Sequence, residues 1–255
     1  SLQAIINDPE KRKKLVIYIN PPYAEATNAR TITSSGKNKG GVATNNKTYE
    51  TYKGTIGKAS NELFAQFFIR IYYELKGCIL AEFSTLKILQ GSNFLDFRSV
   101  FRAKLEKLFI VPANTFDNVK GQFPIGFFIW DTKKEVPFEE ITADVYDAKG
   151  KSIGTKLIHN KSGAINKWLD GCVVNKSSLI GLLDTRGVDM QNQQYIYITH
   201  NSFVITSHSK GVYISSTSLI PISVYIAVRH CIEATWINDR DQFLYPRDTW
   251  QADRE

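Results

Sequence analysis

The tetrad Asn20-Pro21-Pro22-Tyr23 combines residue types that can bind and polarise a planar amine. Two consecutive prolines fix φ at about −65° and remove two backbone donors, so the turn is rigid and its carbonyl oxygens can accept hydrogen bonds. An exocyclic NH2 group can donate one proton to the Asn20 side-chain oxygen and one to the Pro21 backbone oxygen. These two bonds draw the nitrogen toward a tetrahedral, nucleophilic geometry. Tyr23 adds a face on which an aromatic ring can stack.

The tetrad directly follows a short apolar run at residues 15–20, LVIYIN, which is rich in β-branched side chains. Such a run predicts a buried parallel strand. Open α/β sheets bind their ligands outside the carboxyl ends of the strands. The position of the tetrad therefore predicts a ligand site at that edge of a sheet.

Asn20-Pro21-Pro22-Tyr23 matches letter for letter the NPPY signature of the amino-methyltransferases that use S-adenosylmethionine, and the chain resembles the DNA adenine-N6 methyltransferases of that family. In that family the target adenine is flipped out of the duplex, because N6 cannot reach a donor methyl while the base stays stacked. The resemblance implies that Asn20 and Pro21 bind the amine, that Pro22 keeps the turn rigid and that Tyr23 stacks the base. It also implies S-adenosyl-L-methionine as cofactor and double-stranded DNA as partner.

The resemblance extends from residue 15 to residue 131. Asn61-Glu62-Leu63-Phe64, at the start of an apolar stretch, is similar to the family's segment that lines the cofactor pocket, and residues 77–83 and 123–130 are similar to its next strand and its late hairpin strand. The family also carries a glycine-rich turn of the FxGxG type and a later acidic residue before NPPY. Residues 1–14 contain no glycine, and no GxG occurs later. We therefore expect the catalytic half of a larger methyltransferase, inactive without its N-terminal cofactor-binding half.

Residues 28–58 are rich in Thr, Ser, Asn, Gly and Lys and hold six basic residues against one acid. The composition predicts a long mobile loop, and loops of this length inside a domain are usually functional. A solvated insertion is the alternative. Beside a base-flipping motif we expect DNA contacts, with phosphates bound by Arg30, Lys37, Lys39 and Lys47. Tyr49 and Tyr52 either stack on bases or pack against the segment's own body.

The order of predicted elements indicates an α/β fold. A helix over 60–75, a strand over 77–83, a helix over 94–105 and strands over 107–111 and 124–131 follow the first strand. This order predicts a partial Rossmann-like class I methyltransferase sheet with an antiparallel hairpin at its edge, in a catalytic domain over residues 1–134. The pattern of residues 135–255 predicts a mixed α+β extension with a hairpin over 142–158, strands over 195–207 and 211–215, and a helix over 218–236 capped by Ser218. By analogy with the family, this extension begins target recognition or connects to it.

Composition sets the remaining expectations. The 255 residues are 43% hydrophobic and 22% charged with a net charge of +7, which suits a globular protein that meets a polyanion. No apolar run is long enough to span a bilayer, and residues 1–14 lack an export signal. Three scattered cysteines predict neither a disulfide framework nor a zinc site, and the four histidines lack metal-ligand spacing. We expect a cytoplasmic protein without a metal.

The sequence thus predicts a DNA adenine-N6 methyltransferase fragment of a restriction–modification system, of the large type (type IIG or type I-like) in which modification and cleavage share a polypeptide or complex. Restriction subunits are further expected partners. A protein glutamine N5-methyltransferase is an alternative, since it also uses NPPY to hold a planar amide. A cytosine-N4 enzyme is less favoured, because that branch more often has Ser in place of Asn20. A catalytically incomplete DNA-binding module is an alternative of a different class.

Overall fold

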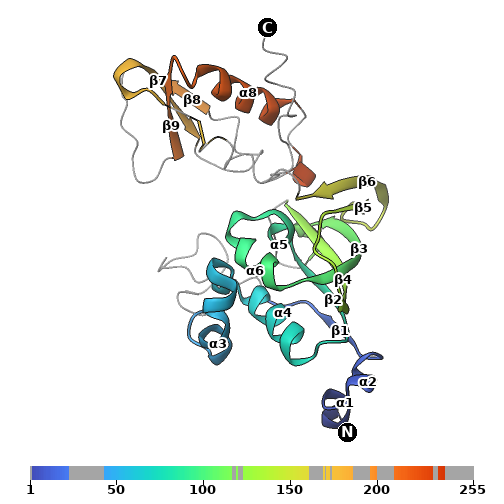
Figure 1. Ribbon diagram of the computed structural model, residues 1–255. Coiled ribbons are helices and arrows are strands. Elements are labelled where there is room, and N and C mark those ends of the chain that lie inside the picture. Colours follow the sequence, from blue (N-terminus) through green and yellow to red (C-terminus); the bar gives the residue numbers. More distant parts are fainter. Residues whose placement is uncertain are drawn as a thin grey trace. The chain divides into compact units, whose positions relative to one another are not determined.

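A computed structural model (Figure 1) describes residues 2–22, 43–116, 119, 123–160, 169, 171–172, 174–185, 196–199, 210–231 and 235–238. The chain divides into two compact units. The first comprises Ser1–Val111 with Ile125–Lys161, and the second comprises Pro112–Pro124 with Ser162–Glu255. Each unit is described by itself below. None of the helices in the described ranges is long and apolar enough to cross a membrane.

The first unit is an α/β unit, as the sequence predicted. Its strands are β1 (Val16–Ile19), β2 (Ile79–Thr85), β3 (Ala103–Pro112), β4 (Pro124–Glu135), β5 (Glu140–Tyr146) and β6 (Ser152–His159). Its helices are α1 (Leu2–Ile6), α2 (Pro9–Arg12), α3 (Lys47–Ile56), α4 (Leu63–Glu74), α5 (Lys87–Gln90) and α6 (Leu95–Val100), with 3-10 turns η1 (Gly57–Asn61) and η2 (Ser92–Phe94).

The six strands form one mixed sheet in the order β1-β2-β4-β3-β5-β6. β1 pairs with β2 and β3 with β5 in parallel, whereas β2 with β4 and β5 with β6 are antiparallel. β3 and β4 form the predicted antiparallel hairpin, because hydrogen bonds from Val136 N to Arg102 O (2.9 Å) and from Ala113 N to Phe123 O (2.8 Å) join their opposite ends. Its predicted place at the sheet edge is wrong, since β5 and β6 extend the sheet beyond β3.

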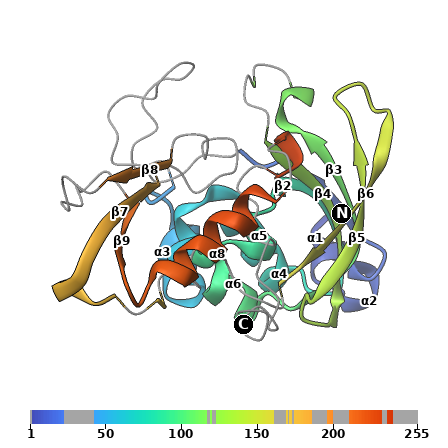
Figure 2. The same cartoon turned by 90° about the horizontal axis from the view of Figure 1, so that it is seen from above.

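Helices α4, α5 and α6 cover one face of this sheet (Figures 1 and 2). Their aromatic side chains form the core: Phe64 stacks on Phe94 at 5.5 Å between ring centroids, and Phe101 meets Trp130 of β4 edge-on at 5.2 Å. Phe97 links the two pairs, and all five side chains are buried. This aromatic layer holds the helices against β2 and β4.

In the first unit, the predicted loop and one predicted helix differ from the structure. Residues 47–56 of the predicted loop form α3, which begins with Asn46 as N-cap, its side chain accepting a hydrogen bond from Tyr49 N at 2.9 Å. Residues 28–42 lie outside the described residues. The predicted helix over 94–105 ends at Val100, because the backbone from Arg102 onward pairs with the end of β4. Residues 103–106 therefore belong to β3.

The second unit contains the antiparallel sheet β8-β7-β9 and a helix. Its elements are η3 (Ala113–Thr115), η4 (Lys176–Ser178), β7 (Leu179–Thr185), β8 (Ile196–Thr199), β9 (Lys210–Ser215), α8 (Leu219–His230) and η6 (Trp236–Asn238). Its core holds Leu169, Leu183, Ile214, Ile222 and Tyr225. The predicted strand over 211–215 is confirmed, β8 covers part of the stretch 195–207, and residues 200–207 lie outside the described part.

The helix predicted from Ser218 is present but ends at His230. Ser218 does not cap the helix with its side chain. Its hydroxyl instead accepts a hydrogen bond from Ser215 N (2.9 Å) and donates one to Tyr213 O (3.1 Å), so it fastens the helix start to β9. The division of the chain at residue 134 stays a prediction, although the predicted hairpin after it, β5–β6, belongs to the sheet of the first unit.

Candidate functional site

The predicted tetrad begins directly after β1, at the carboxyl end of a parallel strand pair. β1 and β2 are in register with Ile19 opposite Glu82, so the carboxyl ends of both strands lie at the same edge of the sheet. Asn20 and Pro22 are exposed and Pro21 is buried. Tyr23 lies outside the described residues. The prediction of a parallel strand before the tetrad is therefore confirmed.

β1 is nevertheless not the buried strand that the sequence predicted. It is the last strand of the sheet, and no other strand in the described ranges pairs with its second side. Val16 and Tyr18 are 61% and 66% exposed. A continuous apolar run normally marks a strand covered on both faces. In this chain the apolar side chains of β1 are covered on one face only.

The segment predicted to line the cofactor pocket lies at the same edge as the tetrad. Glu62, directly before α4, pairs with Lys87, which follows the end of β2, so the start of α4 lies near the carboxyl end of β2. Asn61 is exposed, and Glu62 and Leu63 are half-buried. These three residues therefore reach the surface. Phe64 is 1% exposed, and its ring is part of the aromatic core.

Polar contacts fix the start of α4. The Glu62 carboxylate forms an ion pair with Lys87 Nζ at 2.9 Å, and both side chains are partly buried. The buried side chain of Gln66 donates to the carbonyl oxygens of Ala43 and Ser60, each at 2.6 Å. Because the amide of Gln66 bridges Ala43, which precedes α3, and Ser60 of η1, it holds α3 and η1 against α4.

Glu82 of β2 is a buried carboxyl group beside the tetrad that sequence reasoning missed. Its side chain is fully buried, and its Oε1 accepts hydrogen bonds from Trp130 Nε1 (3.1 Å) and Ser84 Oγ (3.4 Å). Its Oε2 has no hydrogen-bond partner among the described residues. Burial raises the pKa of this carboxyl well above its usual range. The signal in the sequence is one acid within the apolar run at 77–83.

The aromatic and basic residues of α3 differ in their surroundings: Tyr52 packs against α4, whereas Lys47 is exposed. Tyr52 stacks on Tyr73 of α4 with 5.7 Å between ring centroids and 5° between the rings, and its hydroxyl donates to Glu74 at 3.4 Å. Burial and the charge of Glu74 raise the pKa of Tyr52. The packing alternative therefore holds for Tyr52. Lys47 is exposed at the first residue of α3. Arg30, Lys37 and Lys39 lie outside the described residues.

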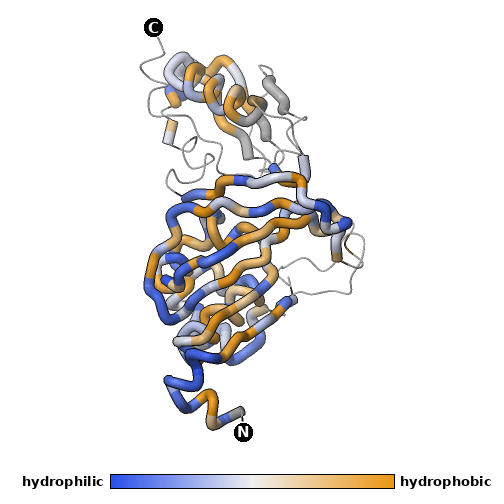
Figure 3. The backbone as a smooth tube through the Cα atoms, turned by 90° about the vertical axis from the view of Figure 1, so that its right-hand side faces the viewer, coloured by the Kyte–Doolittle hydropathy of each residue, from blue (hydrophilic) through white to orange (hydrophobic). Residues whose placement is uncertain are grey.

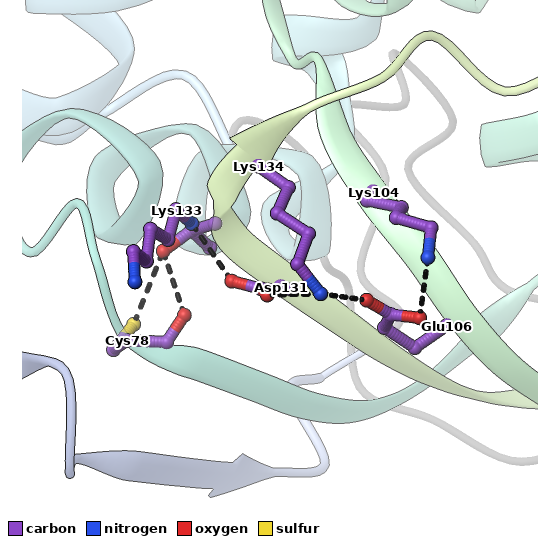
Figure 4. A network of polar contacts seen from close by, with 7 residues as sticks. Cys78, Lys104, Glu106, Asp131, Lys133 and Lys134 are labelled. Carbon is purple, nitrogen blue, oxygen red and sulfur yellow. Dashed lines mark hydrogen bonds and ion pairs between the residues drawn. The ribbon is translucent and has the colours of Figure 1, made fainter.

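A second polar cluster lies where β4 ends (Figure 4). The Thr132 hydroxyl accepts from Gly77 N at 2.9 Å and donates to Cys78 O at 2.7 Å. Lys134 pairs with Asp131 at 3.2 Å and with Glu106 at 2.8 Å, and Lys104 also pairs with Glu106. These groups satisfy one another and fasten β4 to β2 and β3. Within the described ranges, no three His, Cys, Asp or Glu residues are grouped as metal ligands.

Arg98 of α6 is a partly buried cation in the helix layer. Its guanidinium donates to the carbonyl oxygens of Ile88 (3.3 Å) and Gly91 (3.0 Å), and burial lowers its pKa to about 10. It lines a small cavity whose remaining walls are largely apolar, including Phe97 and Trp130. Both hydrogen bonds to carbonyl oxygens tie α6 to α5 and its C-terminal end, which explains the partly buried cation as a structural link.

Comparison with known proteins gives the following results. No protein-family model and no curated protein matches the chain. Among solved structures, the chain is similar to the ATP-dependent Type ISP restriction-modification enzyme LlaBIII bound to DNA, with 8% identity and a TM-score of 0.33 over 54% of this chain and 11% of that one. It is also similar to a cryo-EM structure of a DrdV–DNA complex, with 17% identity and a TM-score of 0.37 over 65% of this chain and 19% of that one. The chain spans less than a fifth of either structure.

Proposed function

We propose that this chain is the catalytic part of an S-adenosylmethionine-dependent DNA adenine-N6 methyltransferase of a restriction–modification system. One observation carries the proposal: Asn20 and Pro21 directly follow a strand that is parallel to its neighbour, at the carboxyl edge of the sheet. This is where open α/β sheets bind ligands.

The chain's own residues bind and orient the amine. The Asn20 side-chain oxygen and the Pro21 carbonyl accept the two N6 protons, and Tyr23 stacks the flipped base. Bound S-adenosylmethionine supplies the methyl group as an electrophilic sulfonium. Asn20 is exposed, so a base can reach it from solvent. The N6 proton leaves after the nitrogen has become cationic, and no dedicated base is needed.

The described residues fit one side of a cofactor site. Asn61, Glu62 and Leu63 reach the surface at the same edge as Asn20, on the side where β2 and α4 lie. On the other side of β1, no strand in the described ranges is present to form a second wall. We therefore propose that the cofactor is held only when a further segment completes the site.

DNA is the proposed substrate because the chain carries a net charge of +7. Lys47 is exposed at the start of α3, in the stretch that also contains Arg30, Lys37 and Lys39. Lys53 is less available, because it pairs with Glu50 at 2.6 Å. We propose that Lys47 binds a phosphate. Lys47→Glu is then expected to weaken DNA binding equally for all sequences and to reduce the salt dependence of the affinity.

The test is a methyl-transfer assay with the complete gene product that contains residues 1–255. Tritiated S-adenosylmethionine and plasmid DNA are the substrates, and N6-methyladenine is identified by mass spectrometry. Asn20→Ala is expected to lower transfer by at least about a hundredfold while leaving cofactor binding intact. Asn93→Ala, on the exposed 3-10 turn η2, is the matched control and is expected to be fully active.

Each other outcome contradicts a specific part of the proposal. Full activity of Asn20→Ala would exclude the tetrad from the reaction. Transfer to the glutamine side chain of a protein, with none to DNA, would support the glutamine methyltransferase alternative. Salt-sensitive DNA binding without transfer to any substrate would identify a non-catalytic DNA-binding module.

A further inference from the structure

A small cavity lies on the face of the six-stranded sheet that α5 and α6 cover. Figure 3 looks onto the other face of the sheet, so both helices lie behind it in that view. The cavity has a volume of about 70 Å³ and is lined by α5 and α6, by β3 and β4, and by the segments that follow β4 and β6. Its walls include Phe97, Arg98, Ala103, Trp130, Phe138 and Asn160. All of these residues belong to the first unit.

Arg98 is the only charged residue among the described residues that line the cavity. Its Nη1 donates to the carbonyl oxygens of Ile88 at 3.3 Å and Gly91 at 3.0 Å, which accounts for one nitrogen of the guanidinium. Within the described part of the chain, Nε and Nη2 have no hydrogen-bond partner, and no carboxylate pairs with Arg98. The side of the guanidinium that carries Nε and Nη2 is therefore available to a ligand.

The surroundings of Arg98 favour a bound anion. Burial lowers the pKa of Arg98 to about 10, because it disfavours the charged form, and the group is still a cation at neutral pH. A cation in apolar surroundings without a counter-ion is unfavourable, and an anion placed against it removes this penalty. The side of a guanidinium that carries Nε and Nη2 can bind both oxygens of a carboxylate through two parallel hydrogen bonds.

The volume and the walls of the cavity limit this anion to a small and partly apolar one. A water molecule needs at least about 10–15 Å³ of cavity, so the volume of 70 Å³ holds a ligand of roughly five non-hydrogen atoms. Most of the wall is aromatic or aliphatic, with Phe97, Phe101 and Trp130 among its residues. A phosphate or sulfate ion would place its remaining charged oxygens against this wall, which costs free energy. A carboxylate with a short aliphatic tail suits both Arg98 and the wall.

Contacts among the wall residues hold the cavity in shape before a ligand enters. Trp130 Nε1 donates to Glu82 at 3.1 Å, and the Trp130 ring meets Phe101 edge-on at 5.2 Å between ring centroids. Asn160 Nδ2 donates to Phe138 O at 2.8 Å, which joins the segments that follow β4 and β6. Because the wall is already ordered, binding requires little further ordering of side chains.

We propose that this cavity binds a small aliphatic monocarboxylate. The two carboxylate oxygens accept hydrogen bonds from Nε and Nη2 of Arg98, and the aliphatic tail packs against Phe97 and Trp130. The described lining residues include neither the tetrad nor any residue of the segment 61–64, so the proposal goes beyond methyl transfer and does not depend on it. The ligand contacts both α6 and β4, so its binding stabilises the folded first unit.

The test is a calorimetric titration of sodium propionate into the complete gene product that contains residues 1–255, at constant ionic strength. Saturable binding with a dissociation constant on the order of a millimolar or below is expected. Propionamide has the same shape without the charge, and its affinity is expected to be at least about tenfold lower. Benzoate carries the charge but exceeds the cavity volume, so it is expected not to bind.

Two variants locate the binding. Arg98→Lys keeps the positive charge but loses the paired donors, so its affinity for propionate is expected to fall by about tenfold or more. Arg102→Lys, the same change at an exposed arginine, is the matched control and is expected to bind propionate normally. Because Arg98 also ties α6 to α5, a second variant leaves it untouched. Ala103→Val adds two carbon atoms to the cavity wall from β3, where valine suits a strand, and is expected to fold normally but to bind at least about tenfold more weakly.

Each other outcome overturns the proposal. Absence of saturable propionate binding up to about 50 mM would exclude the site. Equal affinities for propionate and propionamide would show that the cavity selects shape and not charge. Tighter binding of inorganic phosphate than of propionate would overturn the assigned class of ligand, and unchanged affinity in Ala103→Val would place the binding outside the cavity. These measurements need no methyl transfer, so the site and the proposed function stand or fail separately.

Discussion

Replacing Glu82 by Gln is expected to change how stability depends on pH. The buried carboxyl of Glu82 has a raised pKa because burial disfavours its charged form. The folded state therefore keeps a proton that the unfolded chain releases above a pKa of about 4.3. Stability that Glu82 contributes is fully present below that value and is lost as the pH rises toward the raised folded-state pKa. Across this window the free energy of unfolding falls by about 1.4 kcal/mol per pH unit.

Glutamine has no proton to release and retains a carbonyl oxygen that can accept the hydrogen bond from Trp130 Nε1. Between pH 5.5 and 7.5, the stability of Glu82→Gln relative to the unmodified chain should therefore rise with pH, by at most about 3 kcal/mol. Urea unfolding of the chain, followed by tryptophan fluorescence, measures this difference. Glu139→Gln, at an exposed carboxyl, is the control and should leave the pH dependence unchanged. If the free energy of unfolding changed equally with pH in Glu82→Gln and in the unmodified chain, the reasoning that Glu82 is buried as a neutral acid would be refuted.

Two further substitutions test how the sheet is packed. Gly126→Ala is expected to destabilise the chain by about 1–3 kcal/mol, because its new Cβ would lie 2.5 Å from a ring carbon of buried Phe128; Gly54→Ala in α3, where nothing lies within 4 Å, should instead stabilise by up to about 1 kcal/mol. Thr132→Val should cost about 1–3 kcal/mol, because the amide of Gly77 loses its buried acceptor. Thr132→Ser should keep most of that stability. Thermal melts measure these differences. Equal shifts in melting temperature for Gly126→Ala and Gly54→Ala, or for Thr132→Val and Thr132→Ser, would contradict this reasoning.

Sequence periodicity predicted the strands that carry the site but not their neighbours. The apolar runs before Asn20 and at residues 77–83 are β1 and β2, and the turn after Tyr146 closes the hairpin β5–β6. The order of the strands in the sheet could not be predicted in this way, because it depends on contacts between segments far apart in the chain. The parallel pairing of Phe109 with Asp144 moves the predicted edge hairpin into the interior, and no local pattern encodes it.

The loop predicted from composition is wrong at residues 47–56, where a polar segment folds as a helix against the apolar helix α4. Residues 47–56 contain only one fully buried side chain, Ile56, so their composition resembles that of a loop. Three contacts stabilise the helix there: the N-cap by Asn46, the stacking of Tyr52 on Tyr73, and the ion pair of Lys53 with Glu50. Two of the three are local, but the stacking partner lies on α4. Tertiary packing of this kind decides most helices of marginal propensity.

Asn20 directly follows an edge strand, which has a consequence for the proposed reaction. β1 has four residues, pairs on one side only, and exposes both Val16 and Tyr18. A catalytic group must be held within about 0.5 Å of its productive geometry. β1 is among the least covered strands of this sheet, so its local unfolding is expected to require little free energy. On the proposed function, a partner that paired the second side of β1 would also order Asn20 and Pro21, so ligand binding at the tetrad and protection of β1 should rise together.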